Sequence, residues 1–282
     1  DYPTHKLLRL GHTKWSLVEV AWEDGPYLDQ NTTSTTLLPS AATGLGINLT
    51  LSSVTCVNAD KGWLSTDVGR LVRYKKTTNW GYAVITSITS TTVAVADVRK
   101  DFEAAPTAVT TWKLGAWSGT TGYPQAAGFF EQRLYVAATK DQTQTFWGSQ
   151  TADHENFKPD NDAGTVEADD ALDRTLAADD VNAIYWISAN EDSLIIGTQG
   201  GEWVPKADGI VLTPLDLSAR RQTTHGSARI QPVRIGGVVL FIQRAKRRIR
   251  EFGFSFDING YKAPDMTRLA RHITRGGIVE MD

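Results

Sequence analysis

Short apolar runs alternate with clusters of turn-forming residues along most of the chain. The runs carry alternating or β-branched positions and are bounded by Gly, Asn, Asp or Pro, which is typical of strands joined by turns. They are WSLVEVAW (15–22), GLGINLTLSSVTCV (44–57), RLVRYK (70–75), GYAVITSITSTTVAVADV (81–98), RLYVAAT (133–139), SLIIGT (193–198) and GGVVLFIQR (236–244). Helical periodicity is confined to two short stretches, at about 170–180 and 265–274. The pattern therefore predicts an all-β protein.

The first half of the chain predicts a small β-barrel inserted into a larger β domain. Tight turns are expected at Thr78-Asn79 and Ser90-Thr91, between consecutive antiparallel strands. A long meander without a helix cannot cover both faces of an open sheet, and closure into a barrel removes its exposed edges. The predicted division is 1–35 (N-terminal strands of the main β domain), 36–114 (the inserted barrel) and 115–282 (propeller-like blades).

The last predicted region contains three weakly similar hairpins. In each, an apolar strand starts near Leu134, Leu194 or Val238, and a short polar turn follows. The predicted return strands contain Phe146-Trp147, Trp203-Val204 and Ile249–Phe252. This spacing matches β-propeller blades, with extra loop in the first unit. Because three blades cannot close a ring, we expect the sequence to be a fragment whose missing parts supply further blades.

Composition narrows the class of protein. The apolar fraction is 41%, and the net charge of −3 excludes a globally basic nucleic-acid binder. The single cysteine, Cys56, excludes an internal disulfide framework and a cysteine-based zinc site, and its sequence context predicts a strand position. No apolar run approaches the length of a membrane span.

Residues capable of catalysis or metal binding are present, but no known catalytic motif is. Glu131, Glu202 and Glu251 lie near the ends of the predicted hairpins, where a pair of carboxylates would suit glycoside hydrolysis. The segment 151–180 holds ten acids, and it is open to interpretation as a solvated loop or a weak divalent-ion site around His154. No nucleophile with its base, phosphate-binding loop or dinucleotide motif is found, so no enzyme activity and no cofactor are predicted.

A basic segment is the strongest candidate contact region. Residues 220–250 hold nine Lys or Arg and no acid. The string QRAKRRIRE (243–251) predicts a turn between two strands, with cations facing solvent or an anionic surface. The candidate contact residues are Arg244, Lys246, Arg247, Arg248 and Arg250. They would contact the DNA backbone, which requires only positive charge, or acids such as those of 151–180 in this or a neighbouring subunit.

Seven tryptophans are candidate ligand platforms. They are Trp63, Trp80, Trp112, Trp117, Trp147, Trp186 and Trp203. Because a strand Trp in an all-β fold usually packs in the core, we expect core positions for them, with stacking on sugars or bases as the alternative.

Five segments, in this order, carry a resemblance to a known family. They are WEDGPYLDQN (22–31), GWLSTDVGRLVRY (62–74), GYPQAAGFFEQRLYVAATKDQTQTFWGSQTADHENF (122–157), DSLIIGTQGGEW (192–203) and INGYKAPDMTRLARHI (258–273). Together they resemble the tail tubular or nozzle-type proteins of short-tailed bacteriophages and related prophage tail proteins. The third segment is the most specific to that group, and the acidic segment 151–180 departs from it.

The resemblance implies a non-enzymatic structural protein of the virion tail, made in the cytoplasm of the bacterial host. Such subunits form a ring, commonly a hexamer, that conducts DNA out of the capsid and contacts the adaptor and the fibres. The alternative function is a carbohydrate-binding or glycan-degrading module at the host surface, with Trp platforms and a carboxylate pair.

Overall fold

The computed structural model describes residues 2–178, 182–207 and 211–281. Within them the chain is almost entirely β, with twenty strands and two short 3₁₀ turns, η1 (Ser65–Asp67) and η2 (Phe256–Ile258). The chain divides into two compact units, each of which is described by itself. The first unit contains 1–123 and 155–171, and the second contains 124–154 and 172–282.

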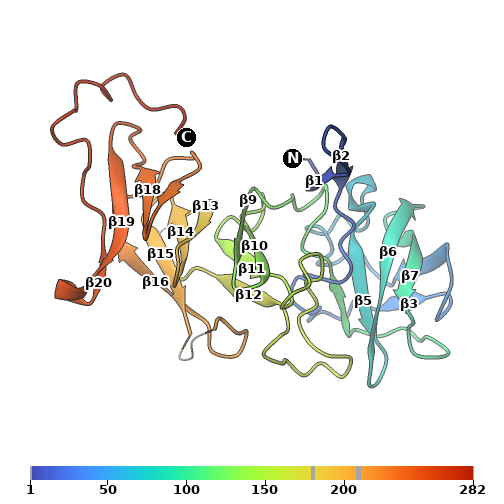
Figure 1. The fold of residues 1–282 in the computed structure, drawn as a ribbon. Coiled ribbons are helices and arrows are strands. Elements are labelled where there is room, and N and C mark those ends of the chain that lie inside the picture. The colour runs from blue at the N-terminus through green and yellow to red at the C-terminus, as the bar shows by residue number, and fades with distance from the viewer. Residues whose placement is uncertain (1, 179–181, 208–210, 282) are drawn as a thin grey trace. The chain divides into compact units, whose positions relative to one another are not determined.

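A six-stranded antiparallel sheet, curled into a half-barrel, forms the body of the first unit (Figure 1). Its order is β3-β4-β7-β6-β5-β8. The strands are β3 (Leu37–Pro39), β4 (Ile47–Leu51), β5 (Leu71–Lys75), β6 (Trp80–Ile88), β7 (Val93–Lys100) and β8 (Trp112–Leu114). Leu37 on the edge strand β3 forms an isolated bridge with Val109, which lies just before β8, the opposite edge strand. Leu37 N donates to Val109 O (2.9 Å), and Val109 N donates to Leu37 O (3.1 Å).

Side-chain alternation places the core of this unit on one face of the sheet. In β4 every second residue is buried (Ile47, Leu49 and Leu51), and the buried ring of Trp63 packs into the same cluster. Burial of alternate residues is what the period of two in the sequence predicts. A two-stranded hairpin, β1 (His5–Arg9) with β2 (Trp15–Glu19), completes the strands of this unit.

Three consecutive four-stranded antiparallel meanders form the second unit, and they are propeller-like (Figure 1). The first blade is β9 (Ala126–Phe130), β10 (Arg133–Ala137), β11 (Thr145–Gly148) and β12 (Leu172–Thr175). The second is β13 (Ile184–Ala189), β14 (Leu194–Thr198), β15 (Glu202–Lys206) and β16 (Ser218–Thr223). The third is β17 (Val233–Ile235), β18 (Val238–Ile242), β19 (Ile249–Ser255) and β20 (Gly260–Lys262).

The three predicted hairpins are the two central strands of these blades. The registers pair Val136 with Trp147 and Ile196 with Trp203, and Val239 with Phe252. Apolar side chains from neighbouring blades share buried clusters, because a single four-stranded sheet cannot cover its own faces. The prediction of an all-β chain with propeller-like blades is confirmed.

Several local predictions are wrong. Residues 172–175 of the expected helix at 170–180 form β12, and residues 179–181 lie outside the described part of the chain. The expected helix at 265–274 is a series of turns. Cys56 is exposed in a turn with φ of 61°, instead of lying on a strand. The sequence pattern in these segments is local, and it does not specify which distant segment of the chain pairs with them.

The grouping of segments also differs from the sequence-based division. Residues 1–35 pack within the unit of the half-barrel sheet. So do residues 155–171, the part of the acidic segment that lies in the connection between β11 and β12. The six-stranded sheet itself runs from Leu37 to Leu114, inside the predicted barrel range. Compactness does not by itself define a domain boundary, so the ranges 1–35, 36–114 and 115–282 stay predictions.

Candidate functional site

Residues 243–248 of the basic segment form the turn between β18 and β19, where the string QRAKRRIRE predicts one. The backbone is fixed by hydrogen bonds from Lys246 N to Gln243 O (2.7 Å) and from Gln243 N to Arg248 O (3.0 Å). Arg244, Lys246 and Arg247 are exposed. No salt bridge among the described residues involves these three side chains. We call them the cationic tip.

The other two candidates in this segment have partners in or just after the third blade. Arg248 lies 3.6 Å from the carboxylate of Asp265. Arg250 is only 8% exposed, and its guanidinium donates to Ala263 O (2.5 Å) and Gln243 Oε1 (3.0 Å). Burial lowers the pKa of Arg250. Arg248 stays 43% exposed in its pair, so the cationic tip differs from it in having no salt bridge among the described residues and not in exposure alone. The predicted contact with DNA or a subunit stays a prediction.

Acids of the segment 151–180 form ion pairs within the first unit. Glu155 pairs with Lys6, and Asp162 pairs with Lys100 and Lys158. Among the described residues, no group of three or more His, Cys, Asp or Glu side chains is placed to hold a metal ion. Two acids of the segment, at 179 and 180, lie outside the described residues.

The most buried of these pairs joins Asp160 to Arg73 on β5. The atoms Nη2 and Oδ1 are 2.5 Å apart, and the Arg73 side chain is 1% exposed. The guanidinium also lies over the rings of Trp80 (4.8 Å) and Tyr27 (5.3 Å). A buried cation requires such compensation because desolvation is costly. At least this part of the acidic segment is structural.

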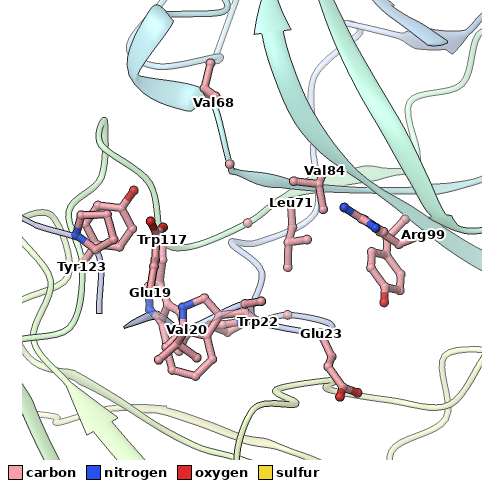
Figure 2. A pocket seen from close by; sticks show the side chains of 17 residues that line it. Glu19, Val20, Trp22, Glu23, Val68, Leu71, Val84, Arg99, Trp117 and Tyr123 are labelled. Atoms are coloured by element: carbon pink, nitrogen blue, oxygen red, sulfur yellow. The ribbon is translucent and has the colours of Figure 1, made fainter. Parts of the chain in front are cut away.

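The first unit also contains a pocket of about 540 Å³, which we call the Trp22 pocket (Figure 2). Its lining residues come from the end of β2, the irregular segment after it, the half-barrel sheet and the chain around 115–123. They are Pro3, Glu19, Val20, Ala21, Trp22, Glu23, Gly25, Pro26, Val68, Gly69, Leu71, Tyr82, Val84, Arg99, Gly115, Trp117 and Tyr123.

An aromatic cluster fixes the floor of the Trp22 pocket. Trp22 packs edge to face on Trp117 (centroids 4.8 Å apart, 62°) and on Phe157 (5.4 Å, 84°). Gly25 permits this arrangement, because its φ is +64° and a Cβ there would lie 2.1 Å from the carbonyl oxygen of Phe157. Figure 2 shows Trp117 and Tyr123 on one side of the view and Arg99 on the other.

The three glutamates that would suit glycoside hydrolysis have separate environments. Glu131 lies in the β9–β10 turn, and its Oε2 accepts a hydrogen bond from Leu212 N (3.0 Å). Glu202 is fully buried on β15 and accepts hydrogen bonds from the hydroxyls of Thr223 and Ser227. Burial raises the pKa of Glu202 despite these hydrogen bonds. Glu251 lies on β19 opposite Leu240.

All seven tryptophans that are candidate platforms are buried, as expected of core residues. Nothing in the sequence marks Trp22, Glu19, Glu23, Arg99 or Tyr123 as site residues. Trp22 begins the motif WEDGPYLDQN, but it follows a strand and carries no periodic signal. Its neighbours in the pocket are brought together only by the fold.

The chain is thus an all-β protein that combines propeller-like blades with a curled half-barrel sheet. No family model matches it, and no curated protein does. A crystal structure of a protein from Lactobacillus plantarum is similar over 82% of this chain and 67% of that chain, with a TM-score of 0.31 and 11% sequence identity. A similarity this low carries no argument. Among the described residues, no helix has the length and apolarity needed to cross a membrane.

Proposed function

We propose that this chain is a structural subunit of a bacteriophage tail, of the tail-tube or nozzle type. It would form a homo-oligomeric ring, a hexamer, in the tail of the virion. The ring would line the conduit for DNA ejection and serve as a platform for the adaptor and fibres. The motif resemblance described above supports this proposal, and propeller-like blades are compatible with it.

The observation that carries the proposal is the cationic tip of the third blade. A backbone held by its own hydrogen bonds presents Arg244, Lys246 and Arg247 to solvent. Such a surface suits weak contact with the phosphate backbone of DNA or with an acidic face of a neighbouring subunit. In a conduit, weak contacts with a stiff polyanion serve better than tight binding, because the DNA has to pass.

Imaging of the intact protein tests the assembly. We expect rings in negative-stain micrographs and a mass, measured by light scattering, that is a whole multiple of the subunit mass. A particle that stays monomeric at the highest soluble concentration would contradict the proposal.

Removal of the cationic tip tests the contact surface. In the variant Arg244→Ala/Lys246→Ala/Arg247→Ala, binding to duplex DNA should weaken equally for unrelated sequences. The slope of log K against log salt should fall by roughly 0.9 for each phosphate that the variant no longer neutralises. A matched control, Lys14→Ala/Lys61→Ala/Lys140→Ala, removes the same charge at other exposed positions. If DNA binding is unchanged by the first variant but the rings disappear, the tip is a subunit contact.

The alternative of a glycan-degrading enzyme finds less support. Such an enzyme needs two carboxyl groups that face a common cleft. Glu202 is fully buried and accepts hydrogen bonds from the hydroxyls of Thr223 and Ser227, which suits a structural carboxyl better than a catalytic one. Hydrolysis of host polysaccharide that is lost in Glu131→Gln or Glu202→Gln would favour the enzyme over the structural subunit.

A further inference from the structure

We infer that the Trp22 pocket of the first unit is a binding site for a short oligosaccharide. This inference goes beyond the proposed tail function and does not depend on it. The volume of about 540 Å³ lies within the range of roughly 300–1,000 Å³ that is common for small-molecule sites. All its lining residues belong to one compact unit, so the pocket does not depend on how the two units are arranged.

The ring of Trp22 supplies a rigid apolar platform. It is half-buried, and Trp117 and Phe157 hold it edge to face from within the unit. Val20 and Leu71 extend the apolar lining beside it (Figure 2). The apolar face of a pyranose ring packs well on an aromatic ring. Because the Trp22 ring is already fixed, it loses little conformational freedom when a ligand binds.

Polar groups around the platform match the hydroxyl groups of a sugar. Glu19, Glu23 and Arg99 are exposed, and no salt bridge among the described residues includes any of them. A carboxylate only accepts hydrogen bonds and a guanidinium only donates them. A ligand whose groups both donate and accept, as hydroxyls do, can therefore satisfy both kinds of side chain.

Charge argues against a phosphate-bearing ligand. Two carboxylates and one guanidinium give the rim a net charge of about −1, which repels nucleotides and nucleic acid. Burial, followed by the nearby Asp24 and Glu23, raises the pKa of Tyr82 in the lining to about 12. Its hydroxyl is therefore neutral and can still donate. The mixture of aromatic faces and a few polar groups suits a neutral or N-acetylated sugar.

Titration with defined oligosaccharides tests the inference on the whole protein. The probes are cellotriose, chitotriose and a trimer of β-linked galactose, and binding is followed by calorimetry and by tryptophan fluorescence. We expect saturable binding of at least one probe, in the micromolar to millimolar range. Trp22→Ala should weaken it roughly tenfold or more, because the stacking surface and the area it buries are removed.

Variants at exposed positions keep the test valid if Trp22→Ala disturbs folding. Arg99→Ala and Glu23→Gln remove rim groups without touching the aromatic cluster, and each should weaken binding several-fold. Trp15→Ala is a matched control, because this Trp is 55% exposed and lies outside the pocket. Removal of the cationic tip should leave sugar binding intact, which separates this test from that of the tail proposal.

Three outcomes would overturn the inference. The first is no saturable binding of any probe at millimolar concentration. The second is binding that Arg99→Ala and Glu23→Gln leave unchanged. The third is displacement of the bound sugar by a short single-stranded oligonucleotide, which would assign the platform to nucleic acid instead.

Discussion

The buried ion pair between Asp160 and Arg73 allows a sharp test of the role of the acidic segment. In Asp160→Asn the shape is kept and the negative charge is lost, so the Arg73 guanidinium stays buried without its counter-ion. Breaking a buried pair in this way costs about 3–5 kcal/mol. Because Trp80 and Tyr27 still cover the cation, at 4.8 and 5.3 Å, we expect a value near the lower end, about 3 kcal/mol.

Asp162→Asn is the matched control from the same segment. Its side chain is 53% exposed where it pairs with Lys100 and Lys158, so solvent screens the interaction. A pair of this kind contributes about 0–1 kcal/mol. The comparison therefore sets a buried pair against an exposed one, with the same chemical change a few residues apart.

Hydrogen exchange is the appropriate assay, because a chain with two compact units need not unfold in a single step. Amides of β5 and β6 should exchange faster in Asp160→Asn, while those of the blades keep the protection of the original protein. The double variant Arg73→Leu/Asp160→Leu should recover part of the loss, since neither buried charge remains. Equal, small effects of Asp160→Asn and Asp162→Asn would refute the assigned role.

Three further predictions concern single residues. Burial raises the pKa of Glu202 above its ordinary 4.5. The stability that protonated Glu202 contributes is therefore full below pH 4.5 and is lost as the pH rises through the pKa of the folded state. Glu202→Gln should abolish this pH dependence, measured by urea titrations across pH. Gly25→Ala should destabilise the first unit by about 2 kcal/mol or more, read by hydrogen exchange, because a Cβ would meet the Phe157 carbonyl and φ is positive. Burial raises the pKa of Glu103, but hydrogen bonds from Thr77 and Thr78 outweigh this and lower it overall. The stability that ionised Glu103 contributes is therefore present above pH 4.5 and is lost as the pH falls through the pKa of the folded state. Glu103→Gln should flatten the acid side of the profile of unfolding free energy against pH.

The blades were predictable because their signals are local. In the hairpin of β10 and β11, Val136 and Trp147 are close in sequence, and a short polar turn separates their strands. Alternation, turn residues and strand length all act within such a segment. The position of the cationic tip followed for the same reason, since a polar run between two apolar strands predicts a turn.

Pairing across long sequence separations was not predictable. Leu172–Thr175 pairs with Thr145–Gly148 in β11, but its own residues carry a weak, helix-like pattern. Residues 172–175 form a strand because they pair with β11, and this pairing outweighs their local helix propensity. Cys56 was also not predictable, because the apolar residues around it indicate a strand while its backbone is left-handed, with φ of 61°.

The Trp22 pocket could not be found from the sequence, because residues far apart in the chain line it. Trp22 follows a strand, Arg99 lies on β7, and Tyr123 ends the first of the two segments that make up the first unit. None of them has a spacing that marks a site. Trp117, one of the seven tryptophans expected in the core, is buried and also lines this pocket, so the sequence-based distinction between core and platform does not separate the two roles.

The return of residues 155–171 to the first unit has a consequence for synthesis on the ribosome. Residues 1–123 are made first, but Asp160 has not yet emerged when they could begin to fold. The first unit can reach its final packing only after β9, β10 and β11 of the second have been translated. Neither unit corresponds to one continuous piece of chain, so a single cut cannot release either of them intact, and their maturation is linked in time by the path of the backbone.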